Sequence, residues 1–112
     1  MTIIERKVEL SNIIGLDGEL DSSTTAYVRA ELRKRIQEGQ VRFILDLSGV
    51  PFLDSSGLSV LVNSLKAARE RGGDIVLLKP SKQVKTLIEL TRLHRVFTVF
   101  DNEDDAVSAH QG

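Results

Sequence analysis

Short apolar runs alternate with longer amphipathic stretches along this 112-residue chain, and this alternation constrains the fold more than any other feature. Two runs come first, at residues 2–8 and 12–20, and they are close enough to form a β-hairpin. Three further runs, at residues 41–50, 74–78 and 96–100, are separated by stretches of helical periodicity. Because parallel strands need crossover connections, this alternation predicts an α/β domain with a mostly parallel central sheet.

The stretches between the runs have apolar residues at the spacing of one helix face. Residues 54–73 follow the i, i+3, i+4, i+7 pattern through Leu58, Leu61, Val62, Leu65 and Ala68. Residues 21–39 and 80–93 have similar periodicity, and residues 101–111 form a shorter helix or a tail. We therefore expect a single domain over residues 1–112, with about five strands and four helices in the order β-β-α-β-α-β-α-β-α.

Local signals place several ends of these elements. Candidate N-caps precede the first helix at Asp21, Ser22, Ser23 and Thr24, and Gly39 is placed to end it. Ser81 is the expected cap of the third helix, which we expect to run as far as Leu93 and to hold His94 near its end. The run at residues 41–50 is almost continuously apolar, which predicts a strand covered on both faces of the sheet.

Composition and charge exclude several classes of function. The net charge is −1, from 15 basic and 16 acidic residues, so long-range attraction to nucleic acid or to an anionic membrane is not expected. There is no cysteine, and no apolar run approaches the roughly 20 residues of a membrane span. The first ten residues mix acids and bases, unlike a signal peptide. We expect a cytoplasmic protein that is a monomer or a weak dimer.

The segment PFLDSSGLSVLV, residues 51–62, places four polar or small residues between two apolar runs. One interpretation is a strand-to-helix turn in which Asp54 or Ser55 caps the helix, Gly57 permits close packing, and Phe52 packs the end of the strand. A second interpretation is a modification site. The carboxyl ends of parallel strands form the usual ligand face, and a phosphate on Ser55 would meet the positive end of a helix. The residues alone leave both interpretations open.

Catalytic and metal-binding patterns are not supported. Leu53 stands where a G-x-S-x-G elbow needs glycine, and no phosphate-binding glycine loop occurs. His94 and His110 are far apart in the sequence, which gives little support for a catalytic triad. The acidic run at residues 101–105 is followed by Ala106 where a calcium loop needs glycine, so acids at a helix N-terminus explain it better. We predict no enzymatic activity, no cofactor and no metal.

Two elements together resemble the STAS domain of bacterial anti-sigma factor antagonists. The first is G-E-L-D at residues 18–21, and the second is D-S-S-G-L at residues 54–58, followed by an apolar helix. The resemblance extends from about residue 3 to about residue 108. Two departures, Ser59 where the family often has glycine and Thr91–Arg92 in place of a glycine-bearing loop, concern the identity of the partner.

The resemblance implies a partner-switching regulator. A serine kinase that is also the anti-sigma factor would phosphorylate Ser55, and a metal-dependent serine phosphatase would remove the phosphate. The unphosphorylated form would bind the kinase and release the sigma factor. The same resemblance implies a partner-binding surface made of Asp21, Ser22, Asp54, Ser56, Gly57 and Leu58. The alternatives are a STAS subunit of a lipid-transport ATPase complex or of a stress-signalling scaffold, and, with less support, a weak nucleotide hydrolase.

Overall fold

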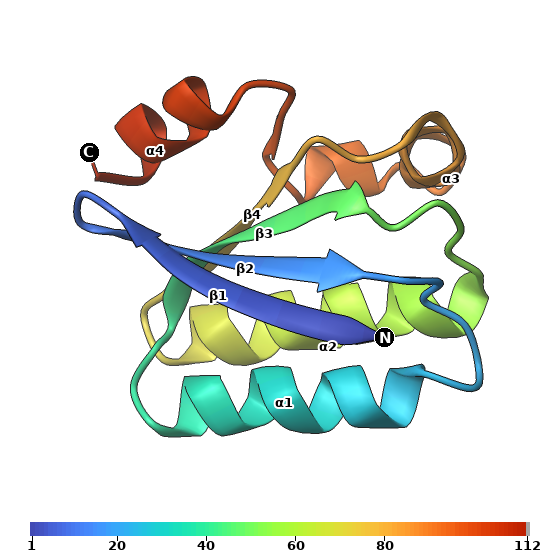
Figure 1. The fold of residues 1–112 in the computed structure, drawn as a ribbon, viewed down its shortest axis with the longest axis horizontal. Coiled ribbons are helices and arrows are strands. Elements are labelled where there is room, and N and C mark those ends of the chain that lie inside the picture. Colours follow the sequence, from blue (N-terminus) through green and yellow to red (C-terminus); the bar gives the residue numbers. More distant parts are fainter. Residues whose placement is uncertain (112) are drawn as a thin grey trace.

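The computed structural model describes residues 1–111 and contains one five-stranded sheet with helices on both faces (Figure 1). The elements, in chain order, are β1 Thr2–Val8, β2 Ser11–Asp17, α1 Thr25–Gln37, β3 Arg42–Gly49, α2 Ser55–Glu70, β4 Asp74–Leu78, α3 Lys82–Leu90, the 3₁₀ helix η1 Leu93–Arg95, β5 Val99–Phe100 and α4 Glu103–Gln111. The predicted order of strands and helices is confirmed.

The sheet is mostly parallel, with the strand order β1-β2-β3-β4-β5. β1 and β2 form the predicted antiparallel hairpin, which turns at Glu9 and Leu10 because Val8 pairs with Ser11. β3 lies in the middle of the sheet, parallel to both β2 and β4. Its apolar side chains face both layers: Phe43 and Leu45 point into the larger core and Ile44 into the smaller one. The expectation that this strand is covered on both faces is therefore confirmed.

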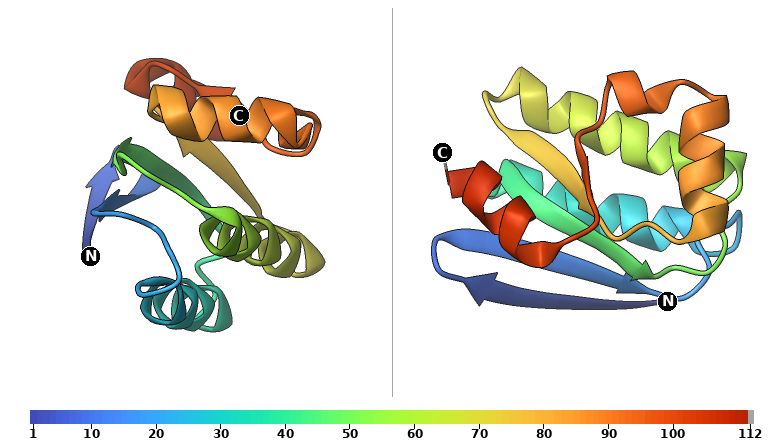
Figure 2. Two further views of the ribbon diagram at one scale, coloured as in Figure 1. Left: turned by 90° about the vertical axis from the view of Figure 1, so that its right-hand side faces the viewer. Right: turned by 90° about the horizontal axis from the view of Figure 1, so that it is seen from above.

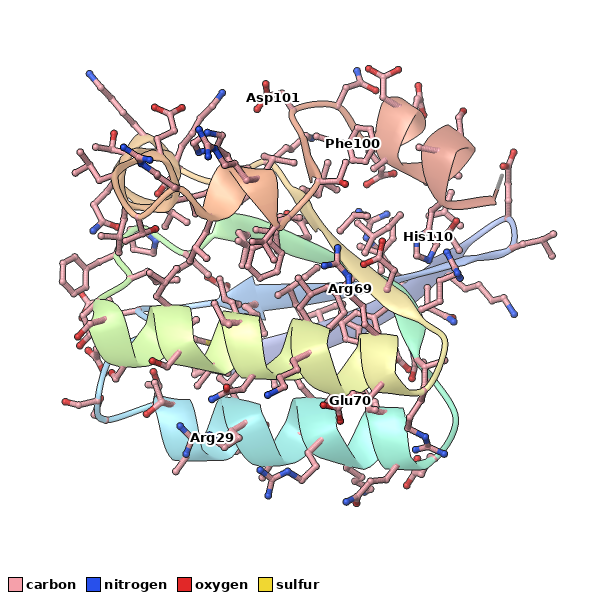
Figure 3. The ribbon with its side chains drawn as sticks, turned by 180° about the vertical axis from the view of Figure 1, so that it is seen from behind. Arg29, Arg69, Glu70, Phe100, Asp101 and His110 are labelled. Atoms are coloured by element: carbon pink, nitrogen blue, oxygen red, sulfur yellow. The ribbon has the colours of Figure 1, made fainter. Side chains whose placement is uncertain are left out.

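The helices cover the two faces unequally (Figures 1 and 2). α1 and α2 lie side by side on one face and enclose the larger core, which includes the buried residues Val28, Leu32, Leu61 and Leu65. On the other face, α4 covers a smaller core formed by Ile13, Ile44, Val76, Leu78, Ala106 and Val107. Phe100 and His110 lie on this α4 side of the molecule (Figure 3). The acids Glu103, Asp104 and Asp105 form the first turn of α4, where their negative charges interact favourably with the positive end of the helix dipole.

The structure corrects one predicted boundary near residue 20 and refines the start of α1. β2 ends at Asp17, and Leu20 rejoins the sheet only as an isolated parallel bridge with Leu53. Residues 22–24 form a turn, and α1 begins at Thr25. The N-cap position therefore falls on Thr24, one of the four predicted candidates, although its side chain makes no capping bond. Gly39, with a φ of 98°, follows the end of α1 as predicted.

The segment after α3 differs most from the expectation. α3 ends at Leu90, not at Leu93, because Arg92 adopts a left-handed conformation with a φ of 61°. His94 consequently lies in η1. The backbone N–H groups of Val96 and Phe97 both donate to the Leu93 carbonyl, which shortens the predicted last strand to two residues. Ser81 caps α3 as predicted, since its hydroxyl accepts from the Val84 N–H at 3.3 Å.

Within residues 1–111, no helix is both long enough and apolar enough to cross a membrane.

Candidate partner-binding site

Two strand-to-helix loops meet at one end of the sheet, as expected from their positions after β2 and β3. Hydrogen bonds join them: the Gly18 N–H donates to the Gly49 carbonyl at 2.9 Å, and the Leu20 N–H donates to the Phe52 carbonyl at 3.0 Å. The Asp54 N–H in turn donates to the Leu20 carbonyl at 3.3 Å. The G-E-L-D and D-S-S-G-L elements are therefore parts of one surface. We name it the loop-pair surface, formed by residues 18–24 and 50–57.

Gly57 holds the two loops together by lacking a side chain. A Cβ atom at this position would lie 2.3 Å from the Leu20 carbonyl oxygen, well inside van der Waals contact. Gly57 is buried, and Leu58 beside it is only 9% exposed. In this conformation both residues are buried beneath the exposed residues of the loop-pair surface. Neither presents a side chain at the surface in this conformation, and direct contact of these two residues with a partner stays a prediction.

Asp54 is the N-cap of α2 and fixes the first turn. Its carboxylate accepts from the Gly57 N–H at 3.0 Å and from the Ser56 hydroxyl at 2.6 Å. These bonds lower the pKa of Asp54, with the Ser56 hydroxyl as the largest cause and the Gly57 N–H as the next. The backbone N–H of Ser22, from the other loop, also contributes to this lowered pKa. Asp54 is thus an ionised cap that joins both loops.

Ser55 is the first residue of α2 and is exposed. Within residues 1–111, its hydroxyl has no hydrogen-bond partner, whereas the neighbouring Ser56 hydroxyl is held by Asp54. The two serines are therefore distinct. Ser55 presents a free hydroxyl at the N-terminus of a helix, and Ser56 is half-buried and engaged.

The loop before α1 contains a second Asp-Ser-Ser sequence at residues 21–23. The Asp21 carboxylate accepts from the N–H of Ser23 at 2.9 Å and from its hydroxyl at 2.6 Å. The hydroxyl bond is the largest cause of the lowered pKa of Asp21, which the nearby charge of Asp54 opposes. Two ionised carboxylates therefore share the loop-pair surface, and Ser22 is exposed beside them.

Gln83, at the start of α3, is a functional contact that the sequence did not reveal. Its side-chain amide donates to the Leu53 carbonyl and accepts from the Leu53 N–H, both at 3.0 Å. This pair of bonds fixes the backbone directly before Asp54. A glutamine in the first turn of a helix is too common to have been singled out as a sequence signal.

Phe52 was expected to pack against the end of the strand, but it is 42% exposed. Its backbone carbonyl accepts a hydrogen bond from the Leu20 N–H. Its side chain adds exposed apolar surface two residues from Asp54. No three His, Cys, Asp or Glu side chains in the part of the chain that the structure describes are placed to hold a metal ion. The loop-pair surface thus presents the exposed serine hydroxyls of Ser22 and Ser55, together with two carboxylates and an exposed aromatic ring.

A five-stranded sheet with this helix arrangement and two joined loops at its carboxyl end defines a STAS domain, and residues 4–106 match the STAS domain family. This chain belongs to that family. Among its relatives, the anti-sigma F factor antagonist of Paenibacillus polymyxa is 33% identical over 97 residues, which cover 86% of this chain and 83% of the relative.

Solved structures show the same relationship in three dimensions. A candidate anti-sigma factor antagonist of Thermotoga maritima has a TM-score of 0.92 at 25% identity, and the match covers 98% of this chain and 95% of the other. SpoIIAA from Bacillus matches in its unphosphorylated form, with a TM-score of 0.75, 23% identity and 99% coverage of both chains. Its phosphorylated form matches with a TM-score of 0.74, 22% identity and coverage of 96% and 98%. At these identities the SpoIIAA structures establish the shared fold.

Proposed function

We propose that this protein is an anti-sigma factor antagonist that is switched by phosphorylation of Ser55. The observation that carries the proposal is the contrast between the two adjacent serines, since Ser55 is exposed with a free hydroxyl and Ser56 donates to Asp54. The names of the relatives support the class of function. The unphosphorylated protein binds a serine-kinase anti-sigma factor through the loop-pair surface, and the sigma factor is released.

In the phosphorylation step, the Ser55 Oγ attacks the γ-phosphorus of the ATP that the partner kinase holds. The new O–P bond forms as the bond to the β-phosphate oxygen breaks, ADP leaves, and the hydroxyl proton passes to a base of the kinase. A serine phosphatase reverses the change by hydrolysis of the phosphoester with water, which returns the hydroxyl and releases inorganic phosphate.

The effect of the phosphate on binding is electrostatic. It adds about 1.5 to 2 negative charges at the first residue of α2, where the helix end tolerates them. The same charges stand beside the ionised Asp54 and Asp21, whose pKa values are already lowered. A partner that accepts two carboxylates must then also desolvate a phosphate, and like-charge contacts and desolvation at an interface each oppose binding.

The test begins with capture of the kinase from cell extract with the Ser55→Ala variant as bait, followed by phosphorylation of purified protein with that kinase and ATP. We expect one phosphate, which mass spectrometry places on Ser55. Ser22→Ala and Ser56→Ala are the matched controls and should still be phosphorylated. A phosphate at Ser22 or Ser56 in the wild type, with Ser55 unmodified, contradicts the assignment.

The binding half of the proposal has its own measurement. Wild type and Ser55→Ala should bind the kinase with similar affinity, and the phosphorylated protein should bind at least tenfold more weakly. Equal binding by the phosphorylated and unphosphorylated forms would show that charge at Ser55 does not control the complex. It would favour a STAS subunit that binds its partners without phosphorylation.

A further inference from the structure

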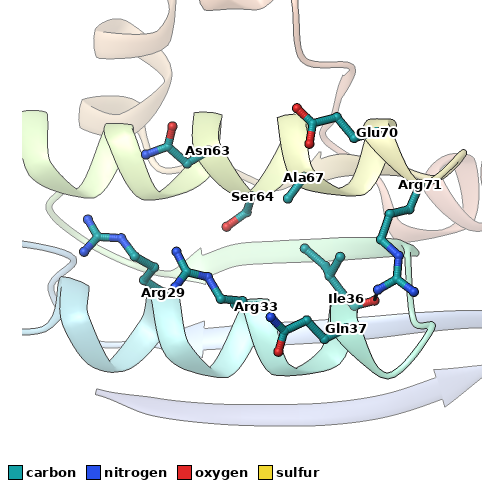
Figure 4. A pocket seen from close by; sticks show the side chains of 9 residues that line it. All are labelled: Arg29, Arg33, Ile36, Gln37, Asn63, Ser64, Ala67, Glu70 and Arg71. Atoms are coloured by element: carbon teal, nitrogen blue, oxygen red, sulfur yellow. Dashed lines mark hydrogen bonds between the residues drawn. The ribbon is translucent and has the colours of Figure 1, made fainter.

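A groove of about 240 Å³ runs between α1 and α2, on the helical layer and away from the loop-pair surface (Figure 4). It begins about two turns along α2 from Ser55, or about 12 Å at 1.5 Å per residue. Its lining residues are Arg29, Arg33, Ile36, Gln37, Asn63, Ser64, Ala67, Glu70 and Arg71. Small side chains on α2, Ser64 and Ala67, leave this space between two helices that otherwise pack closely.

Arg29 and Arg33 lie one turn apart on α1, and both guanidinium groups extend toward α2 (Figure 4). Within residues 1–111 neither side chain forms an ion pair or a hydrogen bond. Two like charges at this spacing on a helix also repel each other. Arg35, on the same helix, is different: it binds Glu5 and Glu31, each at 3.0 Å. Arg29 and Arg33 therefore repel each other and have hydrogen-bond donors that no protein group among the described residues accepts. A bound anion would offset the repulsion and accept hydrogen bonds from both.

Ser64 supplies a donor from the opposite helix. The residue is only 7% exposed, yet its hydroxyl has no protein hydrogen-bond partner among the described residues, and it points into the groove across from Arg33. Its hydroxyl is not sealed from solvent, since the one fully enclosed side-chain oxygen without a partner in residues 1–111 is that of Ser11. The neighbouring Asn63 amide lines the same end of the groove. Two guanidinium groups and a hydroxyl thus face the space between the two helices, with the Asn63 amide at its edge.

The other end of the groove is different in charge. Arg71 is engaged there, since its guanidinium donates to the Ile36 carbonyl at the end of α1. Gln37 and Glu70 supply an amide and a carboxylate, and Ile36 and Ala67 supply apolar surface between the two ends. A ligand that extends along the groove would therefore meet positive charge at one end and hydrogen-bond acceptors at the other.

We propose that this groove binds a small phosphomonoester, with its phosphate held by Arg29, Arg33, Ser64 and Asn63 and its hydroxyl groups directed toward Gln37 and Glu70. Forked guanidinium donors match the oxygens of a phosphate. The volume is slightly below the roughly 300–1,000 Å³ that is usual for drug-sized ligands, which favours a compound the size of a sugar phosphate. This site is independent of the phosphorylation proposed at Ser55.

The test is titration of the ¹⁵N-labelled full chain with ribose 5-phosphate, inorganic phosphate and ATP, followed by two-dimensional NMR. We expect ribose 5-phosphate to shift the amide signals of Asn63 and Ser64 and the Nε–H signals of Arg29 and Arg33. It should bind more tightly than inorganic phosphate, because it reaches Gln37, and at least as tightly as ATP, because the groove is short. Shifts spread over all basic side chains, with affinity that rises only with ligand charge, would overturn the proposal.

Arg29→Gln and Arg33→Gln should each weaken binding of ribose 5-phosphate about tenfold, as expected for loss of a charged hydrogen bond. Lys34→Gln, which removes the same charge from the exposed side of α1, should change binding by less than twofold. Neither arginine has a protein partner among the described residues and the two repel each other, so both variants should have a melting temperature at least as high as the wild type in the absence of ligand. Equal weakening by Lys34→Gln and Arg33→Gln, or a loss of ligand-free stability that parallels the loss of binding, would contradict a phosphate site.

Discussion

The two loops of the loop-pair surface contain the same tripeptide, Asp-Ser-Ser, but they form different structures. In residues 54–56 the aspartate caps α2, which begins at the next residue. In residues 21–23 the aspartate closes a turn, and α1 begins only at Thr25. Each aspartate accepts a hydrogen bond from the hydroxyl of the second serine at 2.6 Å, and the first serine is exposed in both loops. The local hydrogen bonds of the tripeptide are therefore not what decides where a helix starts.

The residue that directly follows each tripeptide, Thr24 or Gly57, makes the difference. Thr24 uses its side chain, since its hydroxyl donates to the Glu19 carbonyl at 2.8 Å and accepts from the Asp21 N–H at 3.1 Å, which holds a turn open before α1. Gly57 acts through the absence of a side chain, because the Leu20 carbonyl occupies the place of its Cβ. The turn of the first loop is thus secured from within, and the helix start of the second is secured by contact with the first.

The largest expected effect is that of Gly57→Ala. The new methyl group would lie 2.3 Å from the backbone oxygen of Leu20, so the loops must separate. We expect a loss of about 2 kcal/mol in the free energy of unfolding from overpacking, in spite of a gain of roughly 1 kcal/mol in helix propensity. Denaturant unfolding measures this. Gly15→Ala, whose nearest contact would be 3.5 Å, is the control and should lose less. Equal losses would mean that Gly57 does not join the loops.

Gln83→Ala should have the next largest effect, and only on the second loop. It removes both hydrogen bonds to the Leu53 backbone, for an expected loss of about 1–2 kcal/mol. Hydrogen exchange should increase at the Leu53 amide and remain unchanged at the Thr25 amide. Gln83→Glu is a useful companion, since it keeps an acceptor for the Leu53 N–H but loses the donor. Faster exchange at both amides in Gln83→Ala would show that the two loops open as one unit.

Thr24→Ala should affect the first loop by about 1 kcal/mol through loss of the hydroxyl bond to the Glu19 carbonyl. Thr24→Ser keeps the hydroxyl and serves as the control, with an expected loss of less than about half that amount. Chemical denaturation gives both values. If serine were as destabilising as alanine, the methyl group and not the hydrogen bond would be the important part of Thr24.

Acid should weaken both loops to a smaller extent. The pKa values of Asp21 and Asp54 are lowered in the folded protein from 3.8, so their ionised forms stabilise the fold above pH 3.8. That contribution is lost as the pH falls through the lower folded values. Asp54→Asn keeps a capping oxygen but cannot titrate, and it should therefore reduce the slope of stability against pH below pH 4. An unchanged slope in Asp54→Asn and Asp21→Asn would exclude these carboxylates as its source.

Much of the fold could be predicted because it depends on periodicity. The strands at residues 2–8 and 74–78 agree with the structure to the residue, and the apolar run at residues 41–50 correctly indicated a central strand. Boundaries that depend on contacts between distant segments were missed. β2 appeared to continue to Leu20 because the bridge between Leu20 and Leu53 places an apolar residue in a loop. The left-handed conformation of Arg92, which ends α3, was not predicted either.

The candidate site shows the same division. The capping role of Asp54 and the position of Ser55 at the start of a helix could be predicted from residue types that are common at helix N-termini. The burial of Leu58 follows from its place on the apolar face of the helix, but the burial of Gly57 could not be predicted, because it results from the approach of residue 20, which is distant in the sequence. The exposure of Phe52 was missed for a related reason: hydrogen bonding of its own backbone to Leu20 sets the direction of the chain there, and apolarity of the side chain does not.

The clamp made by Gln83 has a consequence for how such a surface can evolve. The Gln83 side chain binds only main-chain atoms of residue 53, so these hydrogen bonds do not depend on which side chains occupy the neighbouring positions. A related chain could therefore differ at position 52 or 55, and so in the side chains that it presents there, while it keeps the same backbone frame.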